Sequence, residues 1–142
     1  MNRRAQKKRK VKFIAGGTEM HWLAVALGGA LGATLRYAIS MAIPPVPNKF
    51  PYATFTANLV GSFLMGILFV IVIERAMLHP LWRQFATIGF LGALTTFSTF
   101  SLEVVNLFYQ GHWKMAALYA GLSVSACVIA TYSGYLLIQK VY

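Results

Sequence analysis

Negative charge and cysteine are almost absent from this sequence of 142 residues. Aspartate and glutamate together contribute 3 residues. Charged residues of both signs make up 11% of the chain, whereas a soluble domain normally contains about 25%. This composition excludes an ordinary soluble domain. The single cysteine, Cys127, cannot form an intrachain disulfide.

Apolar residues instead account for 58% of the sequence and gather in four long runs. Each run is close to the roughly 20 residues with which a helix crosses about 30 Å of hydrocarbon. Stretches rich in proline or glycine separate the runs, as in PPVPNKFP at residues 44–51. We therefore predict an all-α integral membrane protein with four transmembrane helices, at residues 22–43, 52–77, 82–109 and 115–138.

Residues 1–19 form a basic segment ahead of the first span, with seven Lys and Arg residues between positions 3 and 12. Such a run can indicate nucleic-acid binding, but the rest of the chain is apolar and has no basic face. We predict a disordered cytoplasmic tail near anionic membrane lipid and no nucleic-acid partner. The apolar stretch that follows is too long for a cleaved signal peptide.

The distribution of Lys and Arg predicts the orientation in the membrane. Ten of them lie on the side that holds both termini and the second linker, and two, Lys49 and Lys114, lie on the other side. The positive-inside rule then places both termini in the cytoplasm of a multi-pass plasma (inner) membrane protein. A chain that starts at Met20 would retain three basic residues against two and could insert in both orientations.

Polar residues inside the spans cost free energy unless each has a partner or a function. The stretch GFLGALTTFSTF, residues 89–100, contains four hydroxyl residues, with Phe97 and Phe100 on one helical face. Glu103 follows within the same span and is a candidate for an ion pathway. Arg36 is either a snorkelling arginine or a functional one. Asn58 either bonds a neighbouring helix or lines a pathway.

Small residues in the first two spans predict close helix packing. Gly28 and Gly32 lie four residues apart on one face, beside Gly29, and the second span contains Gly61 and Gly66. Glycines at such positions let helix backbones approach closely. This pattern does not by itself indicate a function.

Three segments, GGALGATLRY, TANLVGSFLMG and GFLGALTTFSTFSLE, together resemble the Fluc/CrcB family of fluoride channels over residues 20–142. The resemblance implies a fluoride-selective channel that exports cytoplasmic fluoride passively and protects the cell from fluoride toxicity. It also implies a third helix broken at its centre and subunits that pair as an antiparallel dual-topology dimer. Two fluoride pathways would then run along the dimer interface, with a structural sodium ion between the subunits.

The resemblance also assigns roles to individual residues. The positive edges of aromatic rings can meet an anion, and hydroxyl and amide groups would supply hydrogen bonds. The residues that would line the fluoride pathway are Asn58, Phe97, Ser98, Thr99, Phe100, Glu103, Tyr119, Ser123 and Thr131. Arg36 would have a vestibule or structural role. The backbone carbonyls of Gly92 and Thr95 would bind the sodium ion, because carbonyls freed by a helix break need partners in the membrane.

Cys127 departs from the family pattern, which more often has a serine there, and a thiol is a weaker hydrogen-bond donor than a hydroxyl. The start MHWLAVALGG at Met20 resembles the family's usual short lead into the first helix. We therefore expect residues 1–19 to be a lineage-specific tail or an annotation extension. The expected partner is a second copy in an antiparallel homodimer, with an inverted paralogue in a heterodimer as the alternative.

Two other functions remain open at this point: a small multidrug-resistance-like exporter and a non-transporting membrane assembly subunit. The exporter needs a carboxylate in its first helix, and residues 22–43 contain none. The assembly subunit would leave the stretch at residues 89–100 without a purpose. An enzyme is not expected, because the chain has one intramembrane acid and its histidines fall at span ends.

Overall fold

A computed structural model describes residues 3–74 and 79–141. Four helical spans are long and apolar enough to cross a membrane: Glu19–Ala42, Tyr52–Val72, Pro80–Tyr109 and Trp113–Val141. The four predicted transmembrane segments are therefore confirmed. The end of the second predicted span, at residues 75–77, lies outside the described residues.

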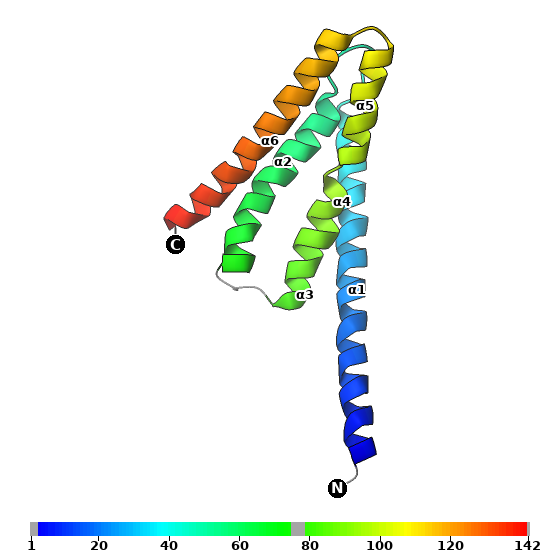
Figure 1. Ribbon diagram of the computed structural model, residues 1–142, viewed down its shortest axis with the longest axis vertical. Coiled ribbons are helices and arrows are strands. Elements are labelled where there is room, and N and C mark those ends of the chain that lie inside the picture. Colours follow the sequence, from blue (N-terminus) through cyan, green and yellow to red (C-terminus); the bar gives the residue numbers. More distant parts are fainter. Residues whose placement is uncertain (1–2, 75–78, 142) are drawn as a thin grey trace.

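The first span belongs to helix α1 (Arg3–Ala42), which extends far beyond the other helices toward the N-terminus (Figure 1). We expected a disordered tail over residues 1–19, whereas the structure continues α1 through this segment from Arg3. Arg, Lys, Ala and Gln all have high helix propensity, and no proline separates the basic segment from the span. Local propensity thus permits one uninterrupted helix here.

The second and fourth spans run in the same direction and form a parallel pair (Figure 1). Helix α2 (Tyr52–Phe69) ends in a π-helical turn, η1 (Val70–Glu74). Helix α6 (Trp113–Val141) packs along α2, where a Cβ atom at Gly66 would collide with the Thr131 carbonyl and one at Gly134 with the Phe63 carbonyl. The two glycines therefore let the α2 and α6 backbones approach closely.

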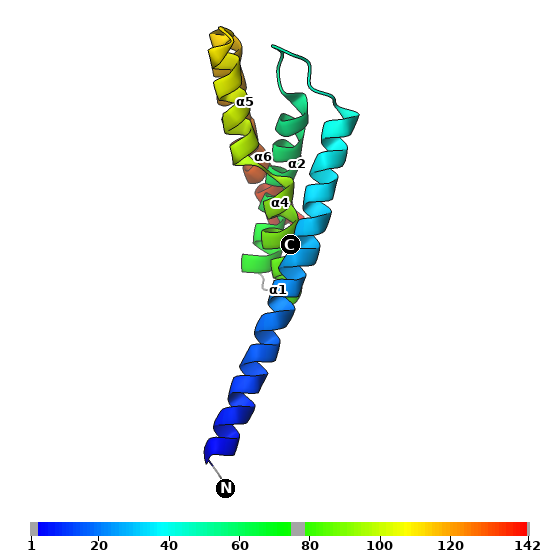
Figure 2. The ribbon, with the colours of Figure 1, turned by 90° about the vertical axis from the view of Figure 1, so that its right-hand side faces the viewer.

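The third span consists of four consecutive elements. These are α3 (Pro80–Arg83), the π-helix η2 (Gln84–Leu91), α4 (Gly92–Leu94) and α5 (Phe97–Tyr109). Figure 2 shows α4 against α1 and α5 inclined away from α1. The predicted break in the third helix is confirmed, and it falls between α4 and α5.

Glycines hold α1 close to this third span. A Cβ atom at Gly28 would collide with the Phe85 carbonyl, and one at Gly32 with the Phe90 carbonyl, both in η2. The predicted packing role of these two glycines is confirmed. Gly29 differs, because a Cβ atom there would meet nothing within 4 Å.

The connections place both described ends of the chain on one side of the bundle. The loop at residues 43–51, in which Asn48 has a positive φ of 62°, lies at the opposite end, beside the turn from α5 to α6 (Figure 1). Gly111 has a φ of 81° in that second turn, a conformation that glycine adopts at little cost. This arrangement agrees with the sidedness predicted from the four spans.

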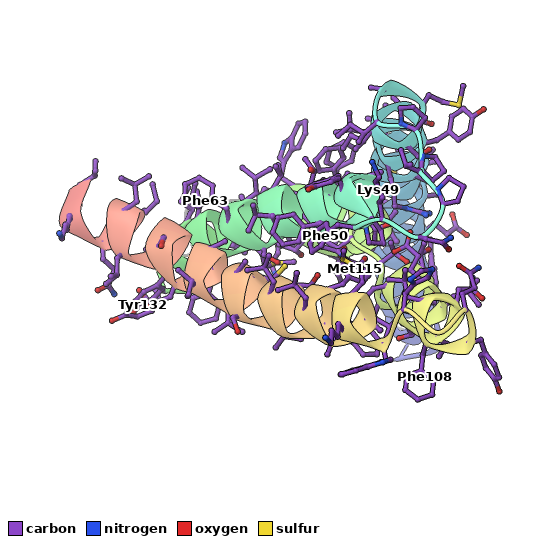
Figure 3. The ribbon with its side chains drawn as sticks, turned by 90° about the horizontal axis from the view of Figure 1, so that it is seen from above. Lys49, Phe50, Phe63, Phe108, Met115 and Tyr132 are labelled. Atoms are coloured by element: carbon purple, nitrogen blue, oxygen red, sulfur yellow. The ribbon has the colours of Figure 1, made fainter. Side chains whose placement is uncertain are left out.

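The buried core is small and lies around the break. One cluster consists of Phe100, Leu107, Ala116 and Tyr119, and Phe50 and Met115 pack against it. Figure 3 shows Phe50 and Met115 between α2 and α6, while Phe108 and Tyr132 point away from the bundle. The second cluster consists of Ala57, Leu91 and Leu94. The break is thus held between two packed groups of apolar side chains.

Candidate functional site

Two extended residues, Thr95 and Thr96, form the break in the third span. Their ψ angles are 152° and 116°, far from the helical value. Asn58 of α2 contacts Thr96 from both sides: its Oδ1 accepts from the Thr96 N–H at 2.8 Å, and its Nδ2 donates to the Thr96 carbonyl at 3.1 Å. The Asn58 amide therefore replaces helical partners that the extended backbone has lost.

The N-terminus of α5 is capped by Thr96, a residue absent from our predicted set. Its Oγ1 accepts from the Thr99 N–H at 3.2 Å and lies 3.0 Å from Thr99 Oγ1. Ser98 Oγ lies 3.3 Å from Thr96 Oγ1. Ser98 itself is on the exposed side of α5. Threonine is one of the residues that commonly cap helix N-termini, so the sequence held a weak signal for this role.

The break also redirects the N–H groups that would otherwise bond to Gly92 and Thr95. In a continuous helix the Gly92 carbonyl would accept from the Thr96 N–H, and the Thr95 carbonyl from the Thr99 N–H. Those donors instead bond to Asn58 and to the Thr96 side chain. The two carbonyls predicted to bind sodium are thus ones that lose their helical donors.

Arg36 supports the break from the first span. Its Nε donates to the carbonyl of Ala93 at 3.1 Å, linking α1 to the end of α4. In a regular helix that carbonyl would accept from the N–H of Phe97. A contact from Arg36 to Ala93 could not be inferred from the sequence, because the two residues are 57 positions apart. Through this contact Arg36 joins the first span to the third.

A cavity of about 210 Å³ opens beside the break. Its lining combines aromatic rings with amide, hydroxyl and thiol groups from three spans: Asn58, Thr95, Thr96, Phe97, Phe100, Ser123, Val124 and Cys127. We call it the break cavity. Four of the predicted pathway residues therefore lie together, and two residues of the break join them.

The two phenylalanines differ sharply in exposure. Their ring centroids are 5.5 Å apart, which confirms that they share one side of α5. Phe100 is 8% exposed and its ring lies 5.2 Å from the Tyr119 ring, whereas Phe97 is 76% exposed. One ring thus belongs to the core of the chain, and the other projects from it.

Ser123 is the most unusual polar residue of the break cavity. It is 5% exposed, and its Oγ has no hydrogen-bond partner among the residues that the structure describes. A buried hydroxyl without a partner costs free energy, so such groups usually bond to a ligand or water. The unpartnered hydroxyl of Ser123 therefore indicates that the break cavity receives a polar or charged ligand.

A second polar cluster surrounds Glu103, one turn beyond Phe100. Thr54 donates to its Oε1 at 2.8 Å, and the Tyr119 hydroxyl donates to its Oε2 at 2.7 Å. Tyr119 is fully buried and Thr54 is 8% exposed. Thr54 was not in the predicted set, since its contact with Glu103 bridges two spans. The carboxylate is therefore held by two hydroxyl groups at fixed positions.

Glu103 also lines a second cavity, of about 280 Å³, between α1, α2 and α5. Arg36, Tyr37 and Ser40 line it from the first span, while Thr96 and Thr99 line it from the break. We call it the arginine cavity. A positive and a negative side chain face the same space, which is unusual within a membrane span.

Three predicted pathway residues do not line either cavity, and one of them, Tyr119, contacts Glu103 instead. Thr131 donates through Oγ1 to the carbonyl of Cys127 at 3.0 Å, within its own helix. Ser98 lies on the exposed side of α5. Neither is among the lining residues of the break cavity or the arginine cavity. Their pathway roles remain predictions.

This geometry defines a four-span helical membrane protein with a break at mid-span and polar cavities on both sides of it. Residues 23–135 match the family described as CrcB-like protein, Camphor Resistance (CrcB). The chain belongs to this family.

Several curated relatives carry the name fluoride-specific ion channel FluC. The protein of Saccharophagus degradans is 57% identical over 113 residues, which cover 77% of this chain and 85% of the relative. That of Magnetococcus marinus is 47% identical over 111 residues, 78% of this chain and 90% of the relative. That of Hahella chejuensis is 46% identical over 115 residues, 80% of this chain and 91% of the relative.

Proposed function

We propose that this chain is a subunit of a fluoride-selective channel through which cytoplasmic fluoride leaves the cell passively, down its electrochemical gradient. The observation that carries the proposal is the break cavity. It brings an amide, two phenylalanines and an unpartnered buried hydroxyl to one point in a chain related to fluoride channels. Export of this kind would protect the cell from fluoride toxicity, and it requires no enzymatic step.

Fluoride must exchange its hydration shell for protein groups on this route. The idealised cost of moving a small ion into a medium of low dielectric is about 20 kcal/mol. The positive edges of Phe97 and Phe100 lower this cost, but weak contacts with rings cannot offset it alone. Ser123 has a free hydroxyl, and Asn58 keeps a second N–H beyond the one given to Thr96. These donors complete the coordination that the rings begin.

The cluster at Glu103 extends the proposed pathway beyond the rings. Tyr119 contacts both Glu103, through its hydroxyl, and Phe100, through its ring. Both hydroxyl donors of this cluster point at the carboxylate in the structure. For fluoride to pass, one hydroxyl must turn from Glu103 to the ion, so the carboxylate acts as a temporary acceptor that keeps these donors ordered.

A second copy of the chain would complete the site. Phe97 and Gly92 are exposed in the single subunit, although both lie near the middle of a membrane span. Exposed polar backbone is costly in lipid, so this face needs a protein partner. We propose an antiparallel dimer, formed by chains that start at Met20 and insert in both orientations, in which Phe97 of each copy is covered by the other. Two equivalent pathways then follow from the symmetry of the pair.

The same interface would hold a structural sodium ion. The carbonyls of Gly92 and Thr95 have lost their helical donors, and carbonyl oxygens are the ligands that bare alkali cations meet in membrane proteins. Arg36 already bonds to the Ala93 carbonyl between them, so that carbonyl has a partner and is not needed by the cation. The bound ion would satisfy backbone dipoles and hold the two breaks together.

Fluoride efflux from liposomes that contain only the purified chain tests this function. We expect rapid efflux of fluoride and little efflux of chloride under the same gradient. For variants that replace Phe97 or Phe100 by isoleucine, the matched control is Phe108→Ile. Phe108 is on the same helix, α5, but points away from the bundle (Figure 3). Absence of fluoride efflux from a correctly folded chain would refute the proposal for this chain alone, and restoration by an inverted paralogue would then identify a heterodimer.

A further inference from the structure

We propose that Cys127 is a modification site at which small, uncharged sulfur electrophiles enter the break cavity and close it. The proposal rests on the channel function above for its effect on ion flow. The modification itself depends only on the geometry of the cavity. The sequence contains no second cysteine, so any thiol adduct of the native chain must be at this residue.

The position of Cys127 makes it reachable from the cavity. The residue is half-buried on α6 and lines the break cavity together with Ser123, which lies one helical turn earlier. Ser123, which is 5% exposed and whose hydroxyl has no hydrogen-bond partner among the described residues, lines the same cavity. This hydroxyl is an independent sign that the cavity admits a small guest, because an empty apolar void would leave it unsatisfied.

The lining of the break cavity suits a small guest that carries partial negative charge. Thr96 and Phe97 also line the cavity, and they mark the N-terminal end of the 13-residue helix α5. The N-terminus of a helix carries partial positive charge, which attracts anions and the negative ends of dipoles. Val124 and the two phenylalanines give part of the lining an apolar surface, which suits an uncharged reagent.

The reaction with methyl methanethiosulfonate is a thiol exchange. The thiolate sulfur of Cys127 attacks the sulfenyl sulfur of the reagent, a new S–S bond forms, and the bond to the sulfonyl sulfur breaks. Methanesulfinate leaves with the bonding electron pair, and the thiol proton passes to solvent. The product carries a methylthio group beside Ser123. Dithiothreitol reverses the modification and restores the thiol.

Closure of the pathway follows from what the methylthio group displaces. An apolar group beside Ser123 cannot replace the hydrogen bonds of a bound water or anion at that hydroxyl. It also extends toward the rings that line the same small cavity, where a packed interior has little room to adjust. A modification at a single sulfur atom would therefore obstruct the route at its narrow, ring-lined part.

The test treats the purified full chain in liposomes with methyl methanethiosulfonate and measures intact mass and fluoride efflux together. We expect one methylthio group per chain and an efflux reduced about tenfold, since the adduct removes hydrogen bonding at one point of the pathway. Dithiothreitol should restore both readouts. A bulky polymer-linked maleimide should label the denatured chain but not the folded one.

Two variants keep the test specific. After treatment with methyl methanethiosulfonate, Cys127→Ser should gain no mass. Its fluoride efflux should equal that of the same variant without treatment. Cys127→Ser combined with Val128→Cys moves the thiol to a neighbour that is 64% exposed and does not line the break cavity. That variant should be labelled without loss of relative efflux.

Three results would overturn the proposal: no labelling of the folded native chain, labelling that leaves efflux unchanged, or equal inhibition through the thiol at position 128. If the untreated chain shows no fluoride efflux, the channel function fails instead. In that case the difference between small and bulky reagents still decides whether Cys127 is a cavity site, because labelling is read by mass.

Discussion

Replacement of Asn58 by leucine is the sharpest test of how the break is held. The two side chains have similar size, so Asn58→Leu removes the amide while it keeps the bulk. The Thr96 N–H then loses the acceptor at 2.8 Å, and the Thr96 carbonyl loses the donor at 3.1 Å. Both groups are backbone dipoles within a membrane span, where water cannot readily replace the lost partner.

The expected loss of stability follows from these two groups. A buried polar group without its partner costs about 1–3 kcal/mol, so two would cost about 2–6 kcal/mol. Interhelical hydrogen bonds in membranes are worth less, about 0.6 kcal/mol on average and up to about 1.7 kcal/mol. We therefore expect a decrease near the lower limit, about 2 kcal/mol in the free energy of unfolding.

The assay is reversible unfolding in mixed micelles, with fluoride efflux measured in parallel. Asn106→Leu is the matched control, because Asn106 is an exposed asparagine on α5 and should change stability by less than about 0.5 kcal/mol. Asn58→Gln keeps the amide on a longer stem and should fall between the two. If Asn58→Leu is no less stable than Asn106→Leu, the amide does not support the break and our reasoning is wrong.

Three further predictions concern ion flow and assembly. Phe97→Ile and Phe100→Ile should each lower fluoride efflux well over tenfold in a folded protein, because isoleucine keeps apolar bulk but lacks the positive ring edge; normal efflux in both would exclude the rings from the pathway. Exchange of sodium for N-methylglucamine should weaken the dimer if the Gly92 and Thr95 carbonyls bind sodium, whereas unchanged dimer stability would contradict that site. Tagging of the C-terminus should show one orientation for the full chain and both orientations for a chain that starts at Met20, since the excess of basic residues then nearly vanishes; mixed orientation of the full chain would show that its charges do not govern insertion.

Much of the architecture was accessible from the order of residues alone. Hydrophobic length predicted the four spans, and the structure confirms them. The family resemblance carried by residues 89–103 implied a break in the third span, which lies at Thr95 and Thr96. Gly28 and Gly32 predicted a close helix contact, and both face η2. These features are local, because each depends on residues within a few turns of one another.

The contacts across spans were not accessible in the same way. Asn58 was assigned to the pathway by resemblance, but the structure shows that its amide also holds the extended backbone of Thr96. Arg36 bonds to Ala93, and Thr54 bonds to Glu103, although neither partner is near in the sequence. The burial of Phe100 and the exposure of Phe97 also depend on which neighbours surround α5.

The sequence by itself determined that this protein spans the membrane four times, and its resemblance to a family implied the break in the third span. Apolar length suffices for the spans, since it acts along a single segment. Only the tertiary structure decided which polar groups satisfy the broken backbone and which remain free. Hydrogen bonds between spans depend on distances of a few ångströms, and those distances arise only when Asn58, Thr96 and Ser123 are brought together by helix packing.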